Sequence, residues 1–194
     1  MRLRHGHANG RLRVARRVLV TALGLSLASC GGRYRPVSDL PVTIGRPYTV
    51  RGITYTPAAA PDYDMVGDAG WYGNESGNRT ARGEKFRAEA ISGAHTTLPL
   101  PSYVEVTALD TGRTILVRVN DRGPFVAGRI IDLSRGAAVL LGIRARGTAP
   151  VRVRRVDPPE RDRARLRAGK SAPPRPDADV ATLAALREQW REHR

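Results

Sequence analysis

The sequence predicts a mainly β protein built around a small six-stranded β-barrel, with one or two short helices and flexible tails on either side. Short stretches of alternating β-forming residues follow one another between residues 65 and 157, separated by turns. Within that region one stretch carries the start and stop signals of a helix. Aromatic residues make up 5% of the 194 residues, beside 14 prolines and 20 glycines, which indicates a modest core and much irregular chain.

Residues 1–29 are predicted to be a signal peptide. The first 17 residues hold six arginines, and the apolar run 18–28 that follows is shorter than the ~20 residues of a transmembrane helix. Leu-Ala-Ser-Cys-Gly at 27–31 resembles a bacterial lipobox, which makes Cys30 the expected lipidation site. The alternative is a buried cysteine in a core helix. Gly31 resembles the outer-membrane sorting signal of lipoproteins, and Arg16-Arg17 loosely resembles a twin-arginine signal, which leaves the export route open.

The charge balance excludes nucleic acid as a partner once export is considered. The whole chain has 33 Lys+Arg against 18 Asp+Glu, a net charge of +15. Removal of 1–29 takes away six cations and no carboxylate, which leaves 27 against 18, or +9. An exported, lipid-anchored protein does not meet chromosomal DNA, whereas a cationic surface suits the anionic polymers of the envelope.

No cofactor or metal is expected. With one cysteine the chain has no disulfide framework and no multi-cysteine metal site. His5 and His7 belong to the signal peptide, so only His95 and His193 remain in the mature chain. The sequence also has no P-loop, no dinucleotide-binding glycine pattern and no Gly-x-Ser-x-Gly elbow.

The mature chain is predicted to have three parts. Residues 30–64 form a lipidated tether with a small hairpin at 48–56, and 65–157 form the barrel. Its strands are expected at 67–72, 103–108, 115–119, 129–133 and from 151, and Ser134 is expected to cap a helix over 135–141 that ends at Gly142.

The third part, 158–194, is an Arg- and Pro-rich tail. Residues 161–179 are expected to be disordered because of that composition. Leu183, Leu186 and Trp190 follow helical spacing, so 179–192 could form a short amphipathic helix. It could dock a partner or simply be a frayed end.

Candidate functional residues lie at the turns between strands. Asn120-Asp121-Arg122-Gly123-Pro124 is what a tight turn requires, but Asp121 could also act chemically. Arg122 beside Asp121 favours the charged carboxylate, which argues against a proton-carrying role unless Arg122 points to substrate.

The other candidates are equally open from their residues. Glu84, after the turn-like stretch 80–83, could be an ordinary surface carboxylate. His95, before a proline-ordered apolar segment, could be a buried structural histidine. Trp71 and Tyr72 could belong to the core or form a platform on which a sugar ring stacks.

Five ordered motifs together resemble the rare lipoprotein A (RlpA) family of septal-ring lytic transglycosylases, over roughly 65–157. They are Gly-Asp-Ala-Gly-Trp-Tyr-Gly at 67–73, Thr-Ala-Arg-Gly-Glu-Lys-Phe at 80–86, Ala-His-Thr-Thr-Leu-Pro-Leu-Pro-Ser-Tyr-Val at 94–104, Val-Arg-Val-Asn-Asp-Arg-Gly-Pro-Phe at 117–125 and Gly-Arg-Ile-Ile-Asp-Leu-Ser at 128–134. The resemblance implies a double-psi β-barrel, an architecture that the family shares with barwin and expansins.

The resemblance also implies an activity. The family cleaves the β-1,4 link between N-acetylmuramic acid and N-acetylglucosamine, preferably in strands stripped of stem peptides, and leaves 1,6-anhydro ends. Its acidic, histidine and aspartate positions fall on Glu84, His95 and Asp121. We expect Asp121 to act as acid and then base, Glu84 to orient the sugar or stabilise its positive charge, and His95 to hydrogen bond one of them.

The implied substrate contacts are Trp71, Tyr72, Asn120 and Arg122. The implied partners are glycan strands, the membrane through Cys30 and proteins of the division machinery, on the periplasmic side of the outer membrane. The alternative is a catalytically silent barrel that binds glycan as a scaffold.

Three departures from the family pattern cluster at one lip of the presumed cleft. Gly70 stands where relatives usually have serine, and Arg82 where they usually have asparagine. The segment 74–78 lacks their Phe-His-Gly. These changes concern substrate stacking and the placement of Glu84.

Overall fold

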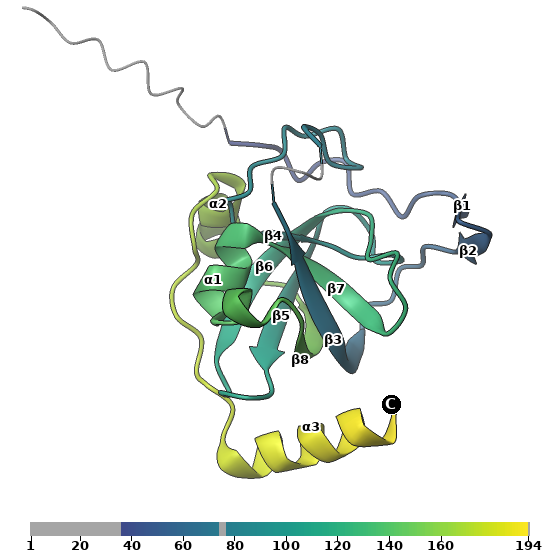
Figure 1. Cartoon of the computed structure of the whole chain (residues 1–194). Helices are drawn as coiled ribbons and strands as arrows, with labels where there is room; N and C mark the ends of the chain where they lie inside the picture. The colour runs from purple at the N-terminus through teal and green to yellow at the C-terminus, as the bar shows by residue number, and fades with distance from the viewer. Residues whose placement is uncertain (1–35, 74–76, 194) are drawn as a thin grey trace, which may run out of the picture. The chain divides into compact units, whose positions relative to one another are not determined.

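Six strands close into the barrel, in the order β3-β7-β4-β6-β5-β8 (Figure 1). The computed structural model describes residues 36–73 and 77–193, so the predicted signal peptide and Cys30 lie outside the described residues. Two neighbouring pairs, β3–β7 and β4–β6, run parallel, and the others run antiparallel. The predicted mainly β fold with a six-stranded barrel is confirmed. The strands are β3 (Asp64–Tyr72), β4 (Ser92–Ala94), β5 (Ser102–Ala108), β6 (Thr114–Asp121), β7 (Arg129–Ser134) and β8 (Ala149–Val156).

The barrel core is formed by the alternating apolar positions of its strands. In the β5–β6 hairpin, Val104 faces Val117 and Val106 faces Ile115, as the alternation predicted. Gly112 closes the turn with a φ of 80°, a conformation that glycine adopts without strain. Five of the barrel strands contribute side chains with 0% exposure, which include Ala69 of β3 and Val104, Val106, Val117, Val119, Ile131, Leu133, Val151 and Val153 of β5 to β8.

The predicted capped helix is present as α1 (Arg135–Leu141), which is followed by the 3₁₀ turn η2 (Arg144–Arg146). The Ser134 hydroxyl accepts a hydrogen bond from the Ala137 N–H at 3.2 Å, and Gly142 ends the helix with a φ of 88°. Ser134 also donates to the Ala90 carbonyl at 2.5 Å, so the cap ties α1 to the loop before β4.

The segment expected to be a tether lies along the barrel. We call residues 36–47 the strap. Thr43 and Leu100 exchange backbone hydrogen bonds of 2.8 Å in both directions. The strap leads into the predicted hairpin, formed by β1 (Tyr48–Val50) and β2 (Ile53–Tyr55), in which Tyr48 is paired with Tyr55.

The segment 161–179, expected to be disordered, is held to the barrel instead. It contains most of α2 (Glu160–Arg167), in which Leu166 is 3% exposed. Arg175 bonds Asp162 at 3.0 Å and lies 3.3 Å from Glu105 of β5. The Arg- and Pro-rich composition predicted disorder because composition does not show which carboxylates the arginines pair with. In the folded chain Arg175 pairs with Asp162 and Glu105.

The C-terminal helix is α3 (Val180–Glu192), close to the expected range, and Asp179 caps its first turn through the Thr182 N–H at 2.9 Å. Its buried Leu186 packs with Leu109, and the Trp190 ring N–H donates to Asp68 at 3.0 Å. This helix therefore docks on its own barrel rather than fraying. Among the described residues, no helix combines the length and apolar character needed to cross a membrane.

Candidate functional site

The three candidate catalytic residues lie around the ends of two parallel neighbours, β4 and β6. Asp121 ends β6, and His95 follows β4 directly. Because these strands run in the same direction, the His95 N–H donates to the Asp121 carbonyl at 3.1 Å. Glu84 comes from the loop between β3 and β4 and contacts β6 side chains. The topology thus brings together residues from three separate motifs.

Glu84 is a fixed, ionised carboxylate with 11% side-chain exposure. The Arg118 guanidinium donates two hydrogen bonds to this carboxylate, at 2.7 and 2.8 Å, and the Asn120 amide donates a third at 2.7 Å. Burial would raise the pKa of Glu84, but these hydrogen bonds and the charges of Arg118 and Arg82 outweigh burial and hold it below its usual value. Glu84 is therefore suited to stabilise positive charge and unsuited to deliver a proton.

Asp121 has the opposite character. Its Oδ1 accepts the backbone N–H groups of Ala81 and Arg122 at 2.7 and 2.8 Å. Within the described part of the chain, its Oδ2 accepts no hydrogen bond. Burial raises the pKa of Asp121 above the ordinary value, and the nearby negative charge of Glu84 adds to that rise. This carboxyl can hold a proton on Oδ2.

The charge of Arg122 does not prevent this, although it follows Asp121 in the chain. Its guanidinium donates to the carbonyls of Leu98 at 2.5 Å, His95 at 3.2 Å and Ile44 at 2.9 Å. It also lies 5.9 Å from the centre of the Tyr48 ring. Arg122 joins loops to each other, and its effect on the pKa of Asp121 is smaller than the effect of burial.

Among the described residues, the His95 side chain makes no hydrogen bond to Glu84 or Asp121, the two carboxylates expected as its partners. Its Nδ1 accepts the Thr97 and Leu98 N–H groups, both at 3.1 Å, so the hydrogen bonds assign the proton to Nε2. The residue is 2% exposed, and its ring meets Tyr63 edge-on at 4.7 Å. Burial, with the charge of Arg122, lowers the pKa of His95 to about 4. His95 is a neutral group that caps the turn after β4.

The two candidate stacking residues face opposite sides of β3, as adjacent strand residues do. Tyr72 stacks on Phe86 at 5.0 Å, and burial, with the charges of Asp121 and Asp132, raises its pKa. Its hydroxyl is buried and has no hydrogen-bond partner among the described residues. Trp71 packs on the core, and its ring centre lies 6.0 Å from the Arg144 guanidinium. Trp71 therefore faces away from the carboxylates, contrary to its expected role in stacking there.

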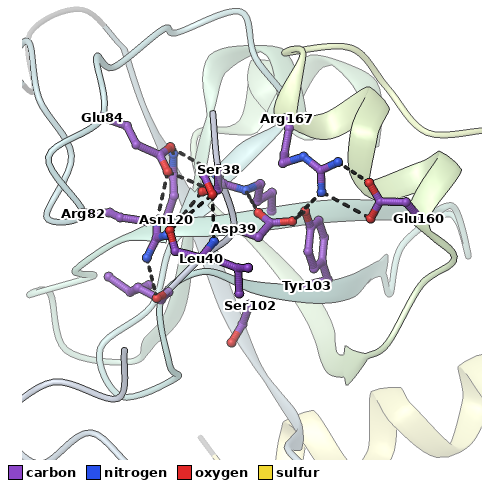
Figure 2. A network of polar contacts seen from close by, with 12 residues as sticks. Ser38, Asp39, Leu40, Arg82, Glu84, Ser102, Tyr103, Asn120, Glu160 and Arg167 are labelled. Carbon is purple, nitrogen blue, oxygen red and sulfur yellow. Dashed lines mark hydrogen bonds and ion pairs between the residues drawn. The ribbon is translucent and has the colours of Figure 1, made fainter. Parts of the chain in front are cut away.

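A groove of about 630 Å³ lies beside Glu84. The strap forms one side of it, and the loop that carries Glu84 forms the other, together with Leu100 and Arg122. Figure 2 shows the polar contacts that connect the two sides. Asn120 takes part in this network. Its amide nitrogen donates to Glu84, and its amide oxygen is buried without a hydrogen-bond partner in the described residues.

Sequence reasoning missed Arg118 and the strap. The side chain of Arg118 is 3% exposed, although the alternation of β6 placed it on the outward face with the polar residues. The sequence signal for Arg118 is its position between Val117 and Val119, two strand residues that are buried. The sequence does not show which segment covers the face of β6 that carries Arg118. The strap covers it, since Asp39 bonds the Arg118 Nε at 2.9 Å.

Comparisons with known proteins point to one family. A family model described as "Lytic transglycolase" matches residues 64–153. "Endolytic peptidoglycan transglycosylase RlpA" of Pseudomonas aeruginosa is 54% identical over 114 residues, which cover 58% of this chain and 33% of the relative. The protein of the same name from Neisseria meningitidis serogroup A is 41% identical over 143 residues, covering 73% and 56%.

The chain thus spans from a third to just over half of the length of these curated relatives. Among solved structures, the Streptomyces papain inhibitor is similar with a TM-score of 0.41 and 27% identity, over 49% of this chain and 96% of the inhibitor. The strap and the β1–β2 hairpin precede the residues matched by the family model.

Proposed function

The chain belongs to the RlpA family by the sequence similarity of its barrel residues to these relatives, and on that premise we propose that it is an endolytic peptidoglycan lytic transglycosylase. Its substrate is the β-1,4 link between N-acetylmuramic acid and N-acetylglucosamine, preferably in strands without stem peptides. The observation that carries the proposal is the pairing of Asp121, whose pKa is raised, with Glu84, whose pKa is lowered.

Asp121 acts first as the acid. Its proton passes to the glycosidic oxygen as the bond from the muramyl C1 to that oxygen breaks, and the bond electrons leave with the oxygen. The C6 hydroxyl of the same muramyl ring then forms the new bond to C1, and its proton returns to Asp121. One carboxyl therefore serves as acid and base, no water is consumed, and the product has a 1,6-anhydro end.

Glu84 supports this step as a fixed negative charge. The sugar ring becomes positively charged as its glycosidic bond breaks, and a carboxylate held by Arg118 and Asn120 needs no reorientation to stabilise that charge. His95 acts as a positioning residue, since it caps the turn whose Leu98 carbonyl receives Arg122.

For substrate binding, the side chains with unused polar atoms are the better candidates. We assign substrate contact to Tyr72 and Asn120, whose buried hydroxyl and amide oxygen have no partner in the described residues. Arg122 and Trp71 are occupied by loop carbonyls and by the core, so their contribution is to hold the site in shape.

The test uses the mature chain without Cys30, residues 31–194, incubated with amidase-treated peptidoglycan. Mass spectrometry of the released material is expected to show anhydro-ended glycans. Asp121→Asn is expected to abolish their release while folding and retention on the glycan persist. Asp110→Asn is the matched control, because that carboxylate pairs with Arg146 away from the site, and it is expected to leave release unchanged.

Two results would contradict parts of this proposal. Unchanged release by Asp121→Asn would remove Asp121 from the mechanism. Retention of the unaltered chain on glycan without any release would favour the non-catalytic scaffold, and would point to the altered lip at 74–82 as the reason.

The proposed setting is the periplasmic face of the outer membrane, with a lipid anchor at Cys30 and a role in cell separation beside division proteins. The lipobox-like segment supports the anchor. The cationic mature chain, at +9, supports contact with anionic envelope polymers. Partitioning of the full chain between the membrane and soluble fractions tests the anchor, and recovery in the soluble fraction alone would contradict it.

A further inference from the structure

The strap is bound by three arginines that also belong to the candidate site. Its carbonyl groups receive the guanidinium N–H groups of Arg82, Arg118 and Arg122, while the first two of these residues also bond Glu84. The strap and the carboxylate therefore share the same cations. A segment that merely led from the membrane to the barrel would not require such contacts.

Arg82 makes the most direct connection. Its Nε lies 3.2 Å from Glu84, its Nη1 donates to the carbonyls of Pro41 at 2.7 Å and Leu100 at 2.9 Å, and its Nη2 donates to Ser38 at 3.2 Å. An asparagine side chain at this position would be too short to span these groups. One guanidinium thus joins the strap to the loop that carries Glu84.

Asp39 fixes the strap from its other side. Its Oδ1 accepts the Arg118 Nε at 2.9 Å, and its Oδ2 accepts the Tyr103 hydroxyl at 2.8 Å and Arg167 at 2.7 Å (Figure 2). Its side chain is 13% exposed. Arg118 thus lies between two carboxylates, Asp39 on the strap and Glu84 at the site.

The exposed surface of the strap suits a sugar ring. Leu40 is 76% exposed, although it lines the groove, and Val42 nearby is 53% exposed. Nothing in the described part of the chain covers them. Sugar rings present apolar C–H faces together with hydroxyl edges. Leu40 therefore offers an apolar contact for such a face inside the groove, which the strap and the loop that carries Glu84 enclose from two sides.

We propose that the strap is the second wall of the glycan-binding groove, and that Arg82 and Asp39 are positioning residues that hold this wall and Glu84 in one frame. The inference rests on the proposed function for its substrate class. It adds to the family barrel a binding surface that lies before the residues matched by the family model.

The test measures glycan binding separately from turnover. In the mature Asp121→Asn background, retention on amidase-treated glycan strands is titrated for the parent, for Arg82→Asn and for Arg79→Asn. Arg79 is the matched control, since it lies in the same loop and, among the described residues, its side chain donates only to the Gly83 carbonyl. Arg82→Asn is expected to weaken binding about fivefold, the size of effect that one or two lost hydrogen bonds produce. Arg79→Asn is expected to bind like the parent.

Two further measurements separate a loosened wall from general damage. Hydrogen exchange of residues 36–47 is expected to quicken in Arg82→Asn, while exchange in β5 and β6 and the melting temperature stay near those of the parent. In the chain with Asp121 intact, Arg82→Asn is expected to raise KM more than it lowers kcat, because Arg118 and Asn120 still hold Glu84. The double variant Arg82→Asn with Asp39→Asn removes both anchors and is expected to bind more weakly still.

Unchanged binding by the double variant would overturn the proposal. Faster turnover or tighter binding after loosening of the strap would overturn it too, since the strap would then exclude substrate. If the unaltered chain releases no anhydro-ended glycan but Arg82→Asn still weakens binding, the wall stands and the transglycosylase proposal fails. If the parent chain is not retained on glycan, both the proposed groove wall and the proposed function are contradicted.

Discussion

Among single residues, the contrast between Glu84 and Asp121 has the clearest chemical consequence. Both are carboxylates near the ends of the same barrel strands, yet their pKa values move in opposite directions. Glu84 receives charged donors, which stabilise the anion more than burial destabilises it. Asp121 receives two backbone N–H groups on one oxygen, which do not offset its burial. Environment rather than residue type therefore separates the two roles.

Glu84→Gln is expected to reduce stability in a pH-dependent way. At pH 7 it leaves Arg118 buried with Asp39 as its remaining carboxylate partner, and the free energy of unfolding should fall by about 3 kcal/mol, the low end for a broken buried ion pair. Because the pKa of Glu84 is lowered by folding, its stabilisation is present above the ordinary value of 4.5 and is lost as pH falls through the folded-state pKa. Urea denaturation near neutral pH and near pH 3 measures this.

The control for that experiment is Glu89→Gln, which removes an exposed carboxylate paired with Arg135. Its effect should stay within ~0.5 kcal/mol. A stability difference between Glu84→Gln and the unaltered chain that is the same at both pH values would contradict the lowered pKa of Glu84.

Among the elements, α1 shows a tertiary contact that overrides helix propensity. Gly136 lies within this helix, where alanine would ordinarily be preferred by about 1 kcal/mol. However, a Cβ at Gly136 would meet the backbone oxygen of Glu89 at 2.3 Å, and the Gly136 N–H donates to the Ala88 carbonyl at 2.8 Å. The helix and the loop before β4 approach too closely for any side chain.

Gly136→Ala is accordingly expected to lower the free energy of unfolding, by about 1–3 kcal/mol, because backbone must move to admit the methyl group. Thermal and urea denaturation measure the change. Val139→Ala in the same helix is the control, since Val139 is 52% exposed. An increase in stability for Gly136→Ala would show that propensity outweighs the contact.

At the scale of the whole molecule, the two ends of the described chain pack against different parts of the barrel. The strap lies at the candidate site, whereas α3 packs on Leu109. Leu109 follows β5 and Asp121 ends β6, and the antiparallel register of these strands places the two residues at opposite ends of their hairpin. Besides Trp190 on Asp68, α3 contributes Arg187, which donates to the Leu109 carbonyl at 2.8 Å.

Deletion of 179–194 is therefore expected to reduce stability without affecting catalysis. It uncovers Leu109, which is 0% exposed in the full chain, and should reduce the free energy of unfolding by about 2–4 kcal/mol. Release of anhydro-ended glycan at a temperature where the truncated chain remains folded should match that of the full mature chain. Loss of release by the folded, truncated protein would place α3 in the site instead.

Local patterns were enough to predict much of the barrel. Alternation over β5 and β6, the Ser134 cap and the Gly142 stop are properties of neighbouring residues, so the chain encodes them in short stretches. The motifs also indicated Glu84, His95 and Asp121 as residues of one site, and β4 and β6 bring the three motifs together. Their roles remain proposals, and within the described residues the His95 ring bonds backbone N–H groups rather than Glu84 or Asp121.

The remaining features depend on contacts between distant parts of the chain. Arg118 donates to Ser38 across 80 positions of sequence, and that contact turns a presumed tether into a wall of the groove. The direction in which a pKa moves, the face to which Trp71 points and the docking of the segment after Pro158 likewise follow from which groups exclude water around a side chain. Burial and charge act through space, so only the tertiary structure could decide them.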